Sequence, residues 1–188
     1  MDEKFDVLNK YGQFTGKTAT RKECHKKGLW HRAVYAFIVD KDFNVLLQRR
    51  SAKKDLWPNR WDVTIGGHVD AGEIGRQALI RECKEELGID IKDNEIKFLV
   101  SSTSVYKTDG YYNRHYDEGY LIIKDIDPNV LKLNSEEVSE VKYFSASDII
   151  NRVNNNYDEL TEKVISWQIL KTILENEEVK KLITNVTR

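Results

Sequence analysis

Residues 67–89 of this 188-residue chain read GHVDAGEIGRQALIRECKEELGI, and this stretch decides the fold. Its apolar residues recur at helical spacing until Gly88, which predicts a helix that this glycine ends. On that helix Glu82, Glu85 and Glu86 stand at i, i+3 and i+4, so their side chains share one face. The apolar residues of the stretch cover the opposite side, which we expect to be buried.

Three carboxylates on one helix face repel each other, and each close pair costs roughly a few tenths of a kcal/mol in an exposed helix. A hard divalent cation reverses the sign of that interaction, because Mg²⁺ takes oxygen ligands and often combines carboxylates with substrate phosphates. Arg81 precedes Glu82 and stands four residues before Glu85, where it can brace a carboxylate for base chemistry. Gly66 and Gly67 let the backbone approach a ligand closely. The alternative is a solvated charged face, which is what most charge runs are.

Taken together, the stretch fits the pattern G-x5-E-x7-R-E-U-x-E-E-x-G-U, in which U is apolar. The matching residues are Gly67, Glu73, Arg81, Glu82, Cys83, Glu85, Glu86, Gly88 and Ile89. The stretch therefore resembles the Nudix box. That resemblance implies an α+β fold, an α/β/α sandwich around a mixed sheet in which the box forms loop, helix and loop. It also implies a hydrolase that uses Mg²⁺ or Mn²⁺ to cleave a diphosphate bond in a nucleoside diphosphate linked to another moiety.

Carried over residue by residue, the resemblance assigns four metal ligands: Glu82, Glu85, Glu86 and the backbone carbonyl of Gly66. Glu82 is also the candidate general base, Arg81 orients it, and Glu73 supports the network. In the mechanism that the family implies, the metals neutralise phosphate charge and lower the pKa of a bound water, which attacks phosphorus.

Many family members use one further acidic residue outside the box. Asp117 and Glu118 are the first candidates for it, and Glu136 and Glu137 come second. None of the four stands at a fixed spacing from the box, so exposed loop charges are the alternative interpretation.

The flanks, about residues 5–90, are similar to type 1 isopentenyl diphosphate isomerase, a branch of the same superfamily. Three histidines that bind a metal in that isomerase match His25, His31 and His68, and the position of its catalytic cysteine holds Gly66. Isomerisation needs an acid–base pair that brackets the double bond, and half of that pair is missing without the thiol. The resemblance therefore favours a hydrolase on an isomerase-like frame.

By the same analogy Arg50 and Lys54 match positions that hold the diphosphate, which suits their chemistry as phosphate donors. A solvated loop is the alternative for both. The histidines either form a second metal site or act as hydrogen-bonding or substrate-contacting residues, and His68 is a candidate substrate contact. No pattern surrounds His115.

Composition sets the broad class of protein. Thirty basic residues oppose thirty-one acidic ones, for a net charge of −1, which argues against a protein that coats nucleic acid. Two separated cysteines exclude a disulfide scaffold and a cysteine-based zinc finger and favour a reducing compartment. The N-terminus is too polar for a secretion signal, and no apolar run reaches the ~20 residues of a membrane helix. We therefore expect a soluble, cytoplasmic protein whose partner is a small-molecule diphosphate substrate.

We expect one Nudix domain with an N-terminal extension over residues 1–29, a core over 30–153 and a helical segment over 154–188. Apolar patterning predicts strands at 5–8, 31–39, 43–48, 61–65, 97–106, 119–124 and 140–144, and helices at about 73–87 and 145–153. An apolar stripe at Leu160, Val164, Trp167, Leu170 and Leu174 predicts a further packed helix. A tyrosine-rich loop is expected over residues 106–116.

Two functional alternatives stay open. One is an enzyme like isopentenyl diphosphate isomerase, and the other is a module that binds a nucleotide without cleaving it. The complete box disfavours the second, because such modules usually have a damaged box. Many family members form dimers, and nothing in this sequence requires or excludes a homodimer. No pattern in the sequence names the substrate.

Overall fold

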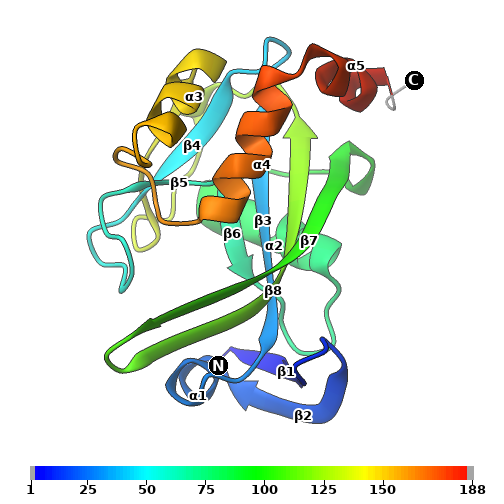
Figure 1. The fold of residues 1–188 in the computed structure, drawn as a ribbon, viewed down its shortest axis with the longest axis vertical. Helices are drawn as coiled ribbons and strands as arrows, with labels where there is room; N and C mark the ends of the chain where they lie inside the picture. The colour runs from blue at the N-terminus through cyan, green and yellow to red at the C-terminus, as the bar shows by residue number, and fades with distance from the viewer. Residues whose placement is uncertain (1–2, 186–188) are drawn as a thin grey trace. The chain divides into compact units, whose positions relative to one another are not determined.

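A computed structural model describes residues 3–185 (Figure 1). Packing divides the chain into two compact units. Unit 1 comprises the residues up to 36 together with 65–85 and 89–121. Unit 2 comprises residues 37–64, 86–88 and those from 122 onward. The arrangement of residues 1–29, 30–153 and 154–188 as one domain stays a prediction.

Unit 1 begins with a small antiparallel sheet of β1 (Lys4–Leu8) and β2 (Phe14–Thr20), followed by α1 (Arg21–Lys27). The strand expected at residues 5–8 is confirmed. A capping box between Thr20 and Glu23 begins α1, and Gly28, at φ 63°, ends it in the left-handed conformation. The sequence analysis assigned neither a strand nor a helix to residues 14–27, because this polar segment has too few apolar residues to show a clear pattern.

Seven strands form the main sheet: β3 (His31–Val39), β4 (Val45–Arg50), β5 (Trp61–Asp62), β6 (Ile65–His68), β7 (Ile96–Thr108), β8 (Tyr111–Ile123) and β9 (Val138–Phe144). The strand order is β5-β4-β3-β8-β7, while β6 pairs with β3 and β9 pairs with β4. In unit 1, β3 and β6 are antiparallel with Tyr35 opposite Gly66. In unit 2, β4 runs antiparallel to β5 and β9.

One strand prediction and one loop prediction were wrong. The single strand expected at residues 61–65 is two strands, β5 and β6. The loop expected at residues 106–116 is strand, because β7 and β8 meet at a tight turn and form the long green hairpin of Figure 1. Gly110, at φ 81°, supplies the left-handed residue that such a turn requires.

The helix expected from the quoted stretch is α2 (Gly75–Leu87), which begins two residues later than predicted. Leu79, Cys83 and Leu87 on it are fully buried, as its apolar face requires. Gly88 ends it at φ 69°, which confirms the predicted stop. A turn of 3-10 helix, η1 (Asp93–Glu95), leads from there to β7.

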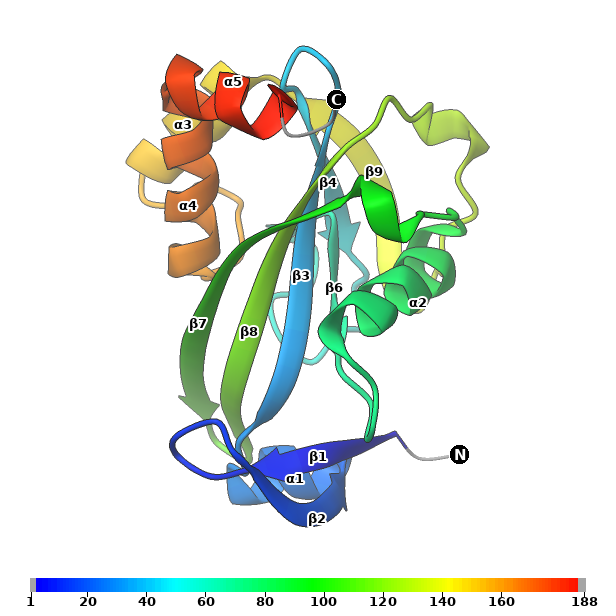
Figure 2. The same cartoon turned by 90° about the vertical axis from the view of Figure 1, so that its right-hand side faces the viewer.

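The helices of unit 2 are α3 (Ala146–Asn154), α4 (Val164–Glu175) and α5 (Glu177–Asn185), with the short η2 (Pro128–Val130) before β9 (Figure 2). Ser145 is the N-cap of α3. Trp167 of α4 is fully buried, and its ring centroid lies 5.5 Å from that of Phe37. Val164 is 47% exposed, so the packed part of the expected stripe does not include it. None of the helices in residues 3–185 has both the length and the apolar character needed to span a membrane.

Candidate functional site

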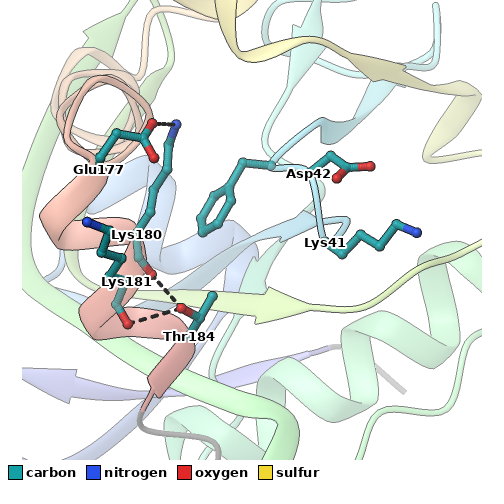
Figure 3. A pocket seen from close by; sticks show the side chains of 7 residues that line it. Lys41, Asp42, Glu177, Lys180, Lys181 and Thr184 are labelled. Carbon is teal, nitrogen blue, oxygen red and sulfur yellow. Dashed lines mark hydrogen bonds and ion pairs between the residues drawn. The ribbon is translucent and has the colours of Figure 1, made fainter.

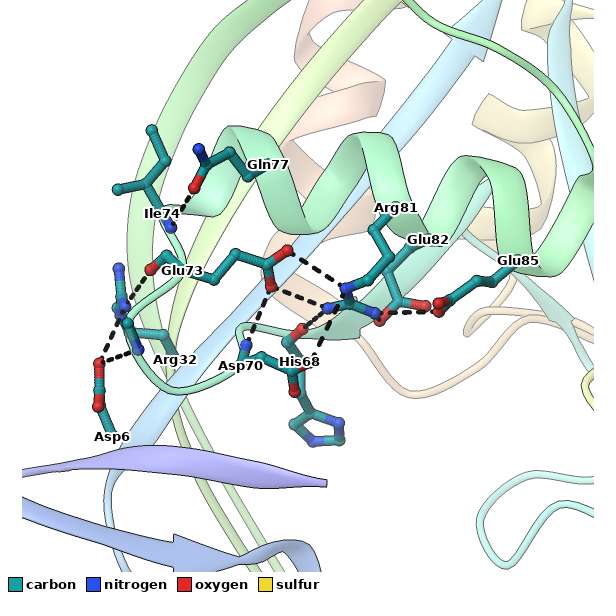
Figure 4. A network of polar contacts seen from close by, with 11 residues as sticks. Asp6, Arg32, His68, Asp70, Glu73, Ile74, Gln77, Arg81, Glu82 and Glu85 are labelled. Atoms are coloured by element: carbon teal, nitrogen blue, oxygen red, sulfur yellow. Dashed lines mark hydrogen bonds and ion pairs between the residues drawn. The ribbon is translucent and has the colours of Figure 1, made fainter. Parts of the chain in front are cut away.

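The guanidinium of Arg81 is the centre of a polar network in unit 1 (Figure 4). Its Nη2 donates to Oε2 of Glu73 at 3.0 Å, and its Nε donates to Oε1 of Glu73 at 3.2 Å. Its Nη1 donates to Oε1 of Glu82 at 2.8 Å and to Oε2 of Glu85 at 3.0 Å. One arginine thus holds three of the carboxylates that the sequence analysis selected, and Glu73 is held by a two-point contact that lysine cannot reproduce.

Glu82 is the most enclosed of these three carboxylates. Its side chain is 14% exposed, and it lies against Gly67 of β6. A Cβ at Gly67 would come within 2.1 Å of the Glu82 carboxyl group, so only glycine leaves room for it. Burial raises the pKa of Glu82 to about 7, although Arg81 acts in the opposite direction. A cation bound beside a buried carboxylate of this kind stabilises the ionised form of the carboxylate.

The charges of this network do not balance. Arg81 contributes one positive charge against the three negative charges of Glu73, Glu82 and Glu85 when all are ionised, which leaves two negative charges. The Asp70 carboxylate adds to the excess, with Oδ2 at 3.9 Å from Nε of Arg81. The atoms that could bind a metal ion in this network are all carboxylate oxygens, which are hard ligands that suit Mg²⁺ or Mn²⁺. The residues present therefore fit the divalent ion that the sequence resemblance implies.

Glu86, the last carboxylate of the quoted pattern, belongs to unit 2. It is 5% exposed, and its Oε2 accepts a hydrogen bond from Nε2 of Gln48 on β4 at 3.0 Å. Gln48 is itself only 3% exposed. The sequence analysis did not single out Gln48, and the only available signal was its place directly after the apolar run Val45–Leu47. The spacing on α2 still places Glu86 on the helix face of Glu82.

β6 borders the network through its backbone. The carbonyl of His68 accepts a hydrogen bond from Nη2 of Arg81 at 2.9 Å. Gly67, which lies against Glu82, precedes it, and Gly66 pairs with Tyr35 across the β3–β6 ladder. Gly67 and the backbone of His68 thus lie beside the carboxylate network. The role of the Gly66 carbonyl as a metal ligand stays a prediction.

The imidazole of His68 points away from this network into a cluster of four histidines. His25, His31, His68 and His115 each offer a ring nitrogen, and these atoms all lie within 4.8 Å of one another. Burial lowers the pKa of His25 to about 4 and that of His31 to about 2, so both are neutral at pH 7. The structure therefore brings together the three histidines of the sequence resemblance and adds His115, which no sequence pattern indicated.

Comparison with known proteins places the chain in a family. The model of the NUDIX domain matches residues 29–167, and this span includes the whole carboxylate network. The chain belongs to the NUDIX domain family.

Three relatives illustrate this membership. Nudix hydrolase 3 of Arabidopsis thaliana is 40% identical over 147 residues, which are 76% of this chain and 19% of that protein. This chain therefore spans about a fifth of that relative's length. An uncharacterized Nudix hydrolase of Listeria innocua is 34% identical over 143 residues, 75% of this chain and 79% of its own. An isopentenyl-diphosphate Delta-isomerase of Salmonella arizonae is 28% identical over 131 residues, 66% of each chain. The predicted NUDIX family is confirmed, and the isomerase is one of the proteins to which this chain is similar.

A crystal structure of a Deinococcus radiodurans protein shares the fold. It has a TM-score of 0.69 and 22% identity, and the match covers 89% of this chain and 97% of that one. This likeness and the sheet with its helices confirm the expected α+β Nudix fold.

Two acids outside the Nudix box lie in unit 1 on β8. Oδ1 of Asp117 lies 3.6 Å from Nδ1 of His115, at the edge of the histidine cluster. Glu118 accepts a hydrogen bond from the hydroxyl of Tyr120 and lies against Gly75, where α2 begins. Each of these two acids thus has a neighbouring side chain as its partner. That one of them is the additional acidic residue of the site stays a prediction.

The predicted diphosphate contacts lie in unit 2. Nη1 of Arg50 donates to Oδ2 of the buried Asp62 at 2.9 Å, and its Nε donates to the carbonyl of Leu56, also at 2.9 Å. Lys54 forms an ion pair with Glu137, and Lys53 pairs with Glu136. These partners support structural roles that compete with diphosphate binding, which stays a prediction for Arg50 and Lys54.

An open surface hollow of unit 2 is lined by Lys41, Asp42, Phe43, Glu177, Lys180, Lys181 and Thr184 (Figure 3). Lys180 forms an ion pair with Glu177 at 2.8 Å, and its Nζ lies 5.4 Å from the ring centroid of Phe43. No predicted site residue lines this hollow. We attach no function to it.

Proposed function

We propose that this Nudix protein hydrolyses a diphosphate bond in a nucleoside diphosphate derivative or a similar metabolite, with Mg²⁺ or Mn²⁺ as its cofactor. The observation that carries the proposal is that Arg81 forms ion pairs with Glu73, Glu82 and Glu85. Three carboxylates share one positive charge, so an excess of negative charge remains on hard oxygen ligands. Such a cluster is costly by itself and is stabilised by a divalent cation. The Nudix hydrolase names of the Arabidopsis and Listeria relatives support the same reaction class.

Glu82, Glu85, Glu86 and the carbonyl of Gly66 are the residues that would hold the ion. The chemistry that Mg²⁺ supplies when bound is neutralisation of phosphate charge and a lowered pKa of a coordinated water. Substrate phosphate oxygens would supply further ligands, because Mg²⁺ sites are commonly shared between a few carboxylates and phosphate oxygens.

The chain's own groups orient this chemistry. Arg81 holds Oε1 of Glu82, so the carboxylate keeps one orientation and its other oxygen can accept the proton of an attacking water. Glu73 holds the guanidinium from the opposite side by two hydrogen bonds. Arg81 is thus a positioning residue, and Glu82 is the candidate base.

An isomerase reaction is the second candidate, because an isopentenyl-diphosphate isomerase is among the relatives. That reaction needs a thiol where this chain has Gly66. Both cysteines of the chain, Cys24 and Cys83, are fully buried, and burial raises the pKa of Cys24 to about 11. Neither can replace the missing thiol, so we expect no allylic product from isopentenyl diphosphate.

The test is a substrate screen with the full chain, in Mg²⁺ and then in Mn²⁺. The panel holds nucleoside di- and triphosphates, ADP-ribose, dinucleoside polyphosphates, coenzyme A and isopentenyl diphosphate. The readout is chromatography and mass spectrometry of the products, because cleavage of ADP-ribose or coenzyme A gives two phosphomonoesters and isomerisation releases no phosphate. We expect at least one nucleotide-derived substrate to be cleaved. Tight nucleotide binding without cleavage across the panel would instead support a binding module, and an allylic product would support the isomerase.

Variants of the box make the test specific. Glu82→Gln and Glu86→Gln should each lower turnover by about 100-fold or more while the circular dichroism spectrum stays unchanged. Glu178→Gln on α5 is the matched control, because its side chain is 78% exposed and forms an ion pair with Lys181 on the same helix. Full activity in both box variants would contradict the metal site.

A further inference from the structure

The loop that connects β6 to α2, residues 69–74, carries Glu73. This segment is neither helix nor strand, so no regular element fixes the position of the Glu73 carboxylate. That position matters, because Glu73 makes the two-point contact with Arg81, and Arg81 in turn holds Glu82. An irregular loop keeps one shape only where other elements hold it, so its contacts with the rest of unit 1 bear on the candidate active site.

β1 holds this loop at two successive backbone amides. The N–H of Ala71 donates to the carbonyl of Lys4 at 2.8 Å. The N–H of Gly72 donates to Oδ2 of Asp6 at 3.1 Å. The side chain of Asp6 is 16% exposed, so this hydrogen bond to a charged group is partly shielded from water. In Figure 2, β1 passes beside the loop that precedes α2, as these contacts require.

Arg32 of β3 links β1 to Glu73 itself (Figure 4). Its Nη2 donates to the backbone carbonyl of Glu73 at 2.6 Å and lies 3.5 Å from Oδ2 of Asp6. Its own backbone carbonyl accepts a hydrogen bond from the N–H of Val69 at 3.1 Å. Oδ2 of Asp6 therefore faces both the guanidinium of Arg32 and the N–H of Gly72, and one carboxylate oxygen joins β1, β3 and the loop.

We propose that Asp6 and Arg32 are positioning residues of the candidate active site, and that β1 is thereby part of its support. This inference rests on the proposed hydrolase function. The contacts run from Asp6 through Arg32 to the backbone of Glu73, and the Glu73 carboxylate holds Arg81 against Glu82. Asp6 lies outside residues 29–167, which match the NUDIX domain model, so membership of the family assigns it no role.

A positioning role and a purely structural role predict different kinetics. A contact that only stabilised unit 1 would change the Tm, while the folded protein would keep its kcat. A contact that fixes the orientation of Glu82 through Arg81 acts on the transition state, so its loss lowers kcat and leaves KM nearly unchanged.

The experiment is steady-state kinetics of variants of the full chain at saturating Mg²⁺, on a substrate that the wild type cleaves. Asp6→Ala removes the acceptor oxygen and should lower kcat by about 10- to 100-fold, with KM within about twofold. Asp6→Asn keeps an oxygen that can accept from Gly72 and Arg32, so it should recover most of the lost kcat. Arg32→Lys cannot contact both Asp6 and the Glu73 carbonyl, and it should lower kcat about tenfold. This milder change carries the test if Asp6→Ala does not fold.

Glu23→Ala is the control for a loss of stability in the same unit. The Glu23 carboxylate accepts hydrogen bonds from the N–H of Thr20 at 3.3 Å and from Lys27 at 3.1 Å, so it supports α1 rather than the loop. We expect this variant to have a lower Tm and a kcat within about twofold of the wild type.

A second measurement does not depend on hydrolysis. Nε of Arg81 donates to Glu73 at 3.2 Å, so the NMR signal of its Nε–H group should shift in Asp6→Ala and in Arg32→Lys. The corresponding signal of Arg76, which bonds elsewhere on the same helix, should stay in place. If the wild type cleaves no substrate, the proposed function fails, and the Arg81 signal decides the positioning role by itself.

Three results would overturn the positioning role while the hydrolase function stands. The first is a kcat within twofold of the wild type in folded Asp6→Ala or in Arg32→Lys. The second is an Asp6→Asn variant as impaired as Asp6→Ala. The third is an Arg81 signal that neither variant moves.

Discussion

Arg81 and His68 are joined by a hydrogen bond of 2.9 Å, from Nη2 of the guanidinium to the backbone carbonyl of the histidine. The side chain of the same histidine lies in the four-histidine cluster, while the guanidinium holds the Nudix carboxylates. Gly67, one residue earlier, lies against Glu82. The short strand β6 therefore borders both the carboxylate network around Arg81 and the histidine cluster, and its position matters to each of them.

The first prediction concerns the two-point contact between the guanidinium of Arg81 and the carboxylate of Glu73. Arg81→Lys keeps the positive charge, but lysine cannot bond Glu73 at two points and reach Glu82 and His68 as well. We expect kcat/KM to fall by roughly 10- to 100-fold while the protein stays folded, because a positioning contact rather than a metal ligand is lost. Steady-state kinetics at saturating Mg²⁺ and circular dichroism measure both quantities.

The control for this variant is Arg76→Lys on the same helix. Arg76 bonds Asp93 and the carbonyl of Ile96, away from the carboxylates. We expect this change to lower the Tm slightly and to leave kcat/KM within about twofold, as is usual for a substitution near the surface. Equal losses of activity in the two variants would contradict a special role for Arg81.

The second prediction concerns stability in unit 2. Asp62 is 1% exposed and accepts hydrogen bonds from Arg50, Thr161 and Lys163, each at 2.9 Å. Burial by itself would raise the pKa of Asp62, but Lys163 and Arg50 lower it to about 2, below its ordinary value of 3.8. A lowered pKa adds stability above pH 4, and this contribution disappears as the pH falls through 2. Asp62→Asn should therefore destabilise the protein by about 3 kcal/mol near neutral pH, with a smaller difference at pH 2–3.

Urea unfolding of both proteins between pH 2 and 7 measures this difference. Glu159→Gln is the matched control, since Glu159 pairs with Arg152 but has 62% of its side chain exposed. We expect that change to cost less than about 1 kcal/mol. A constant effect of Asp62→Asn across the pH range would show that its ion pairs do not stabilise the fold.

The part of the fold that the sequence predicts well is the part with strong local signals. The spacing of Glu82, Glu85 and Glu86 and the stop at Gly88 predict α2 to within two residues. The Asp109-Gly110 pair is an equally local signal for a hairpin, but the polar residues around it favoured a loop instead. Strands that face solvent on one side lack the apolar runs by which buried strands are recognised.

The part that the sequence could not predict depends on contacts between distant residues. His115 lies ninety positions after His25, and no spacing rule links them. Gln48 meets Glu86 only because β4 and the end of α2 pack together in unit 2. The partners of Arg50 and Lys54, Asp62 and Glu137, are likewise fixed by tertiary structure. Local patterns specify which side chains a helix presents, but not which side chains meet them.

The third prediction tests Gln48, the residue that sequence reasoning missed. Its amide donates to Oε2 of Glu86 at 3.0 Å and orients a candidate metal ligand. Gln48→Met removes the donor at similar volume, so the Mg²⁺ concentration for half-maximal activity should rise about tenfold while activity at saturating Mg²⁺ changes less. Gln168→Met is the control, because Gln168 lies on α4 and its side-chain amide donates to the hydroxyl of Tyr157 instead. An unchanged Mg²⁺ requirement would remove Gln48 from the site.

The fourth prediction follows from the close approach of β6 to α2. The Cβ introduced by Gly67→Ala would lie 2.1 Å from the Glu82 carboxyl group, so the carboxylate must move away from its contact with Arg81. A displacement of about 1 Å at a reacting group can cost about 100-fold in rate. We therefore expect kcat/KM to fall by that amount, together with a loss of Mg²⁺ affinity.

Gly72→Ala separates this effect from a general cost of replacing glycine. Gly72 lies in the loop that follows β6 and has nothing within 4 Å of its would-be Cβ, but its φ of 79° makes alanine strained. That strain should lower the stability by about 1 kcal/mol and leave kcat/KM nearly unchanged. Thermal unfolding and kinetics of the two variants should therefore show opposite patterns, with activity lost at Gly67 and mainly stability lost at Gly72. If Gly67→Ala kept full activity, Glu82 could not be the carboxylate on which the reaction depends.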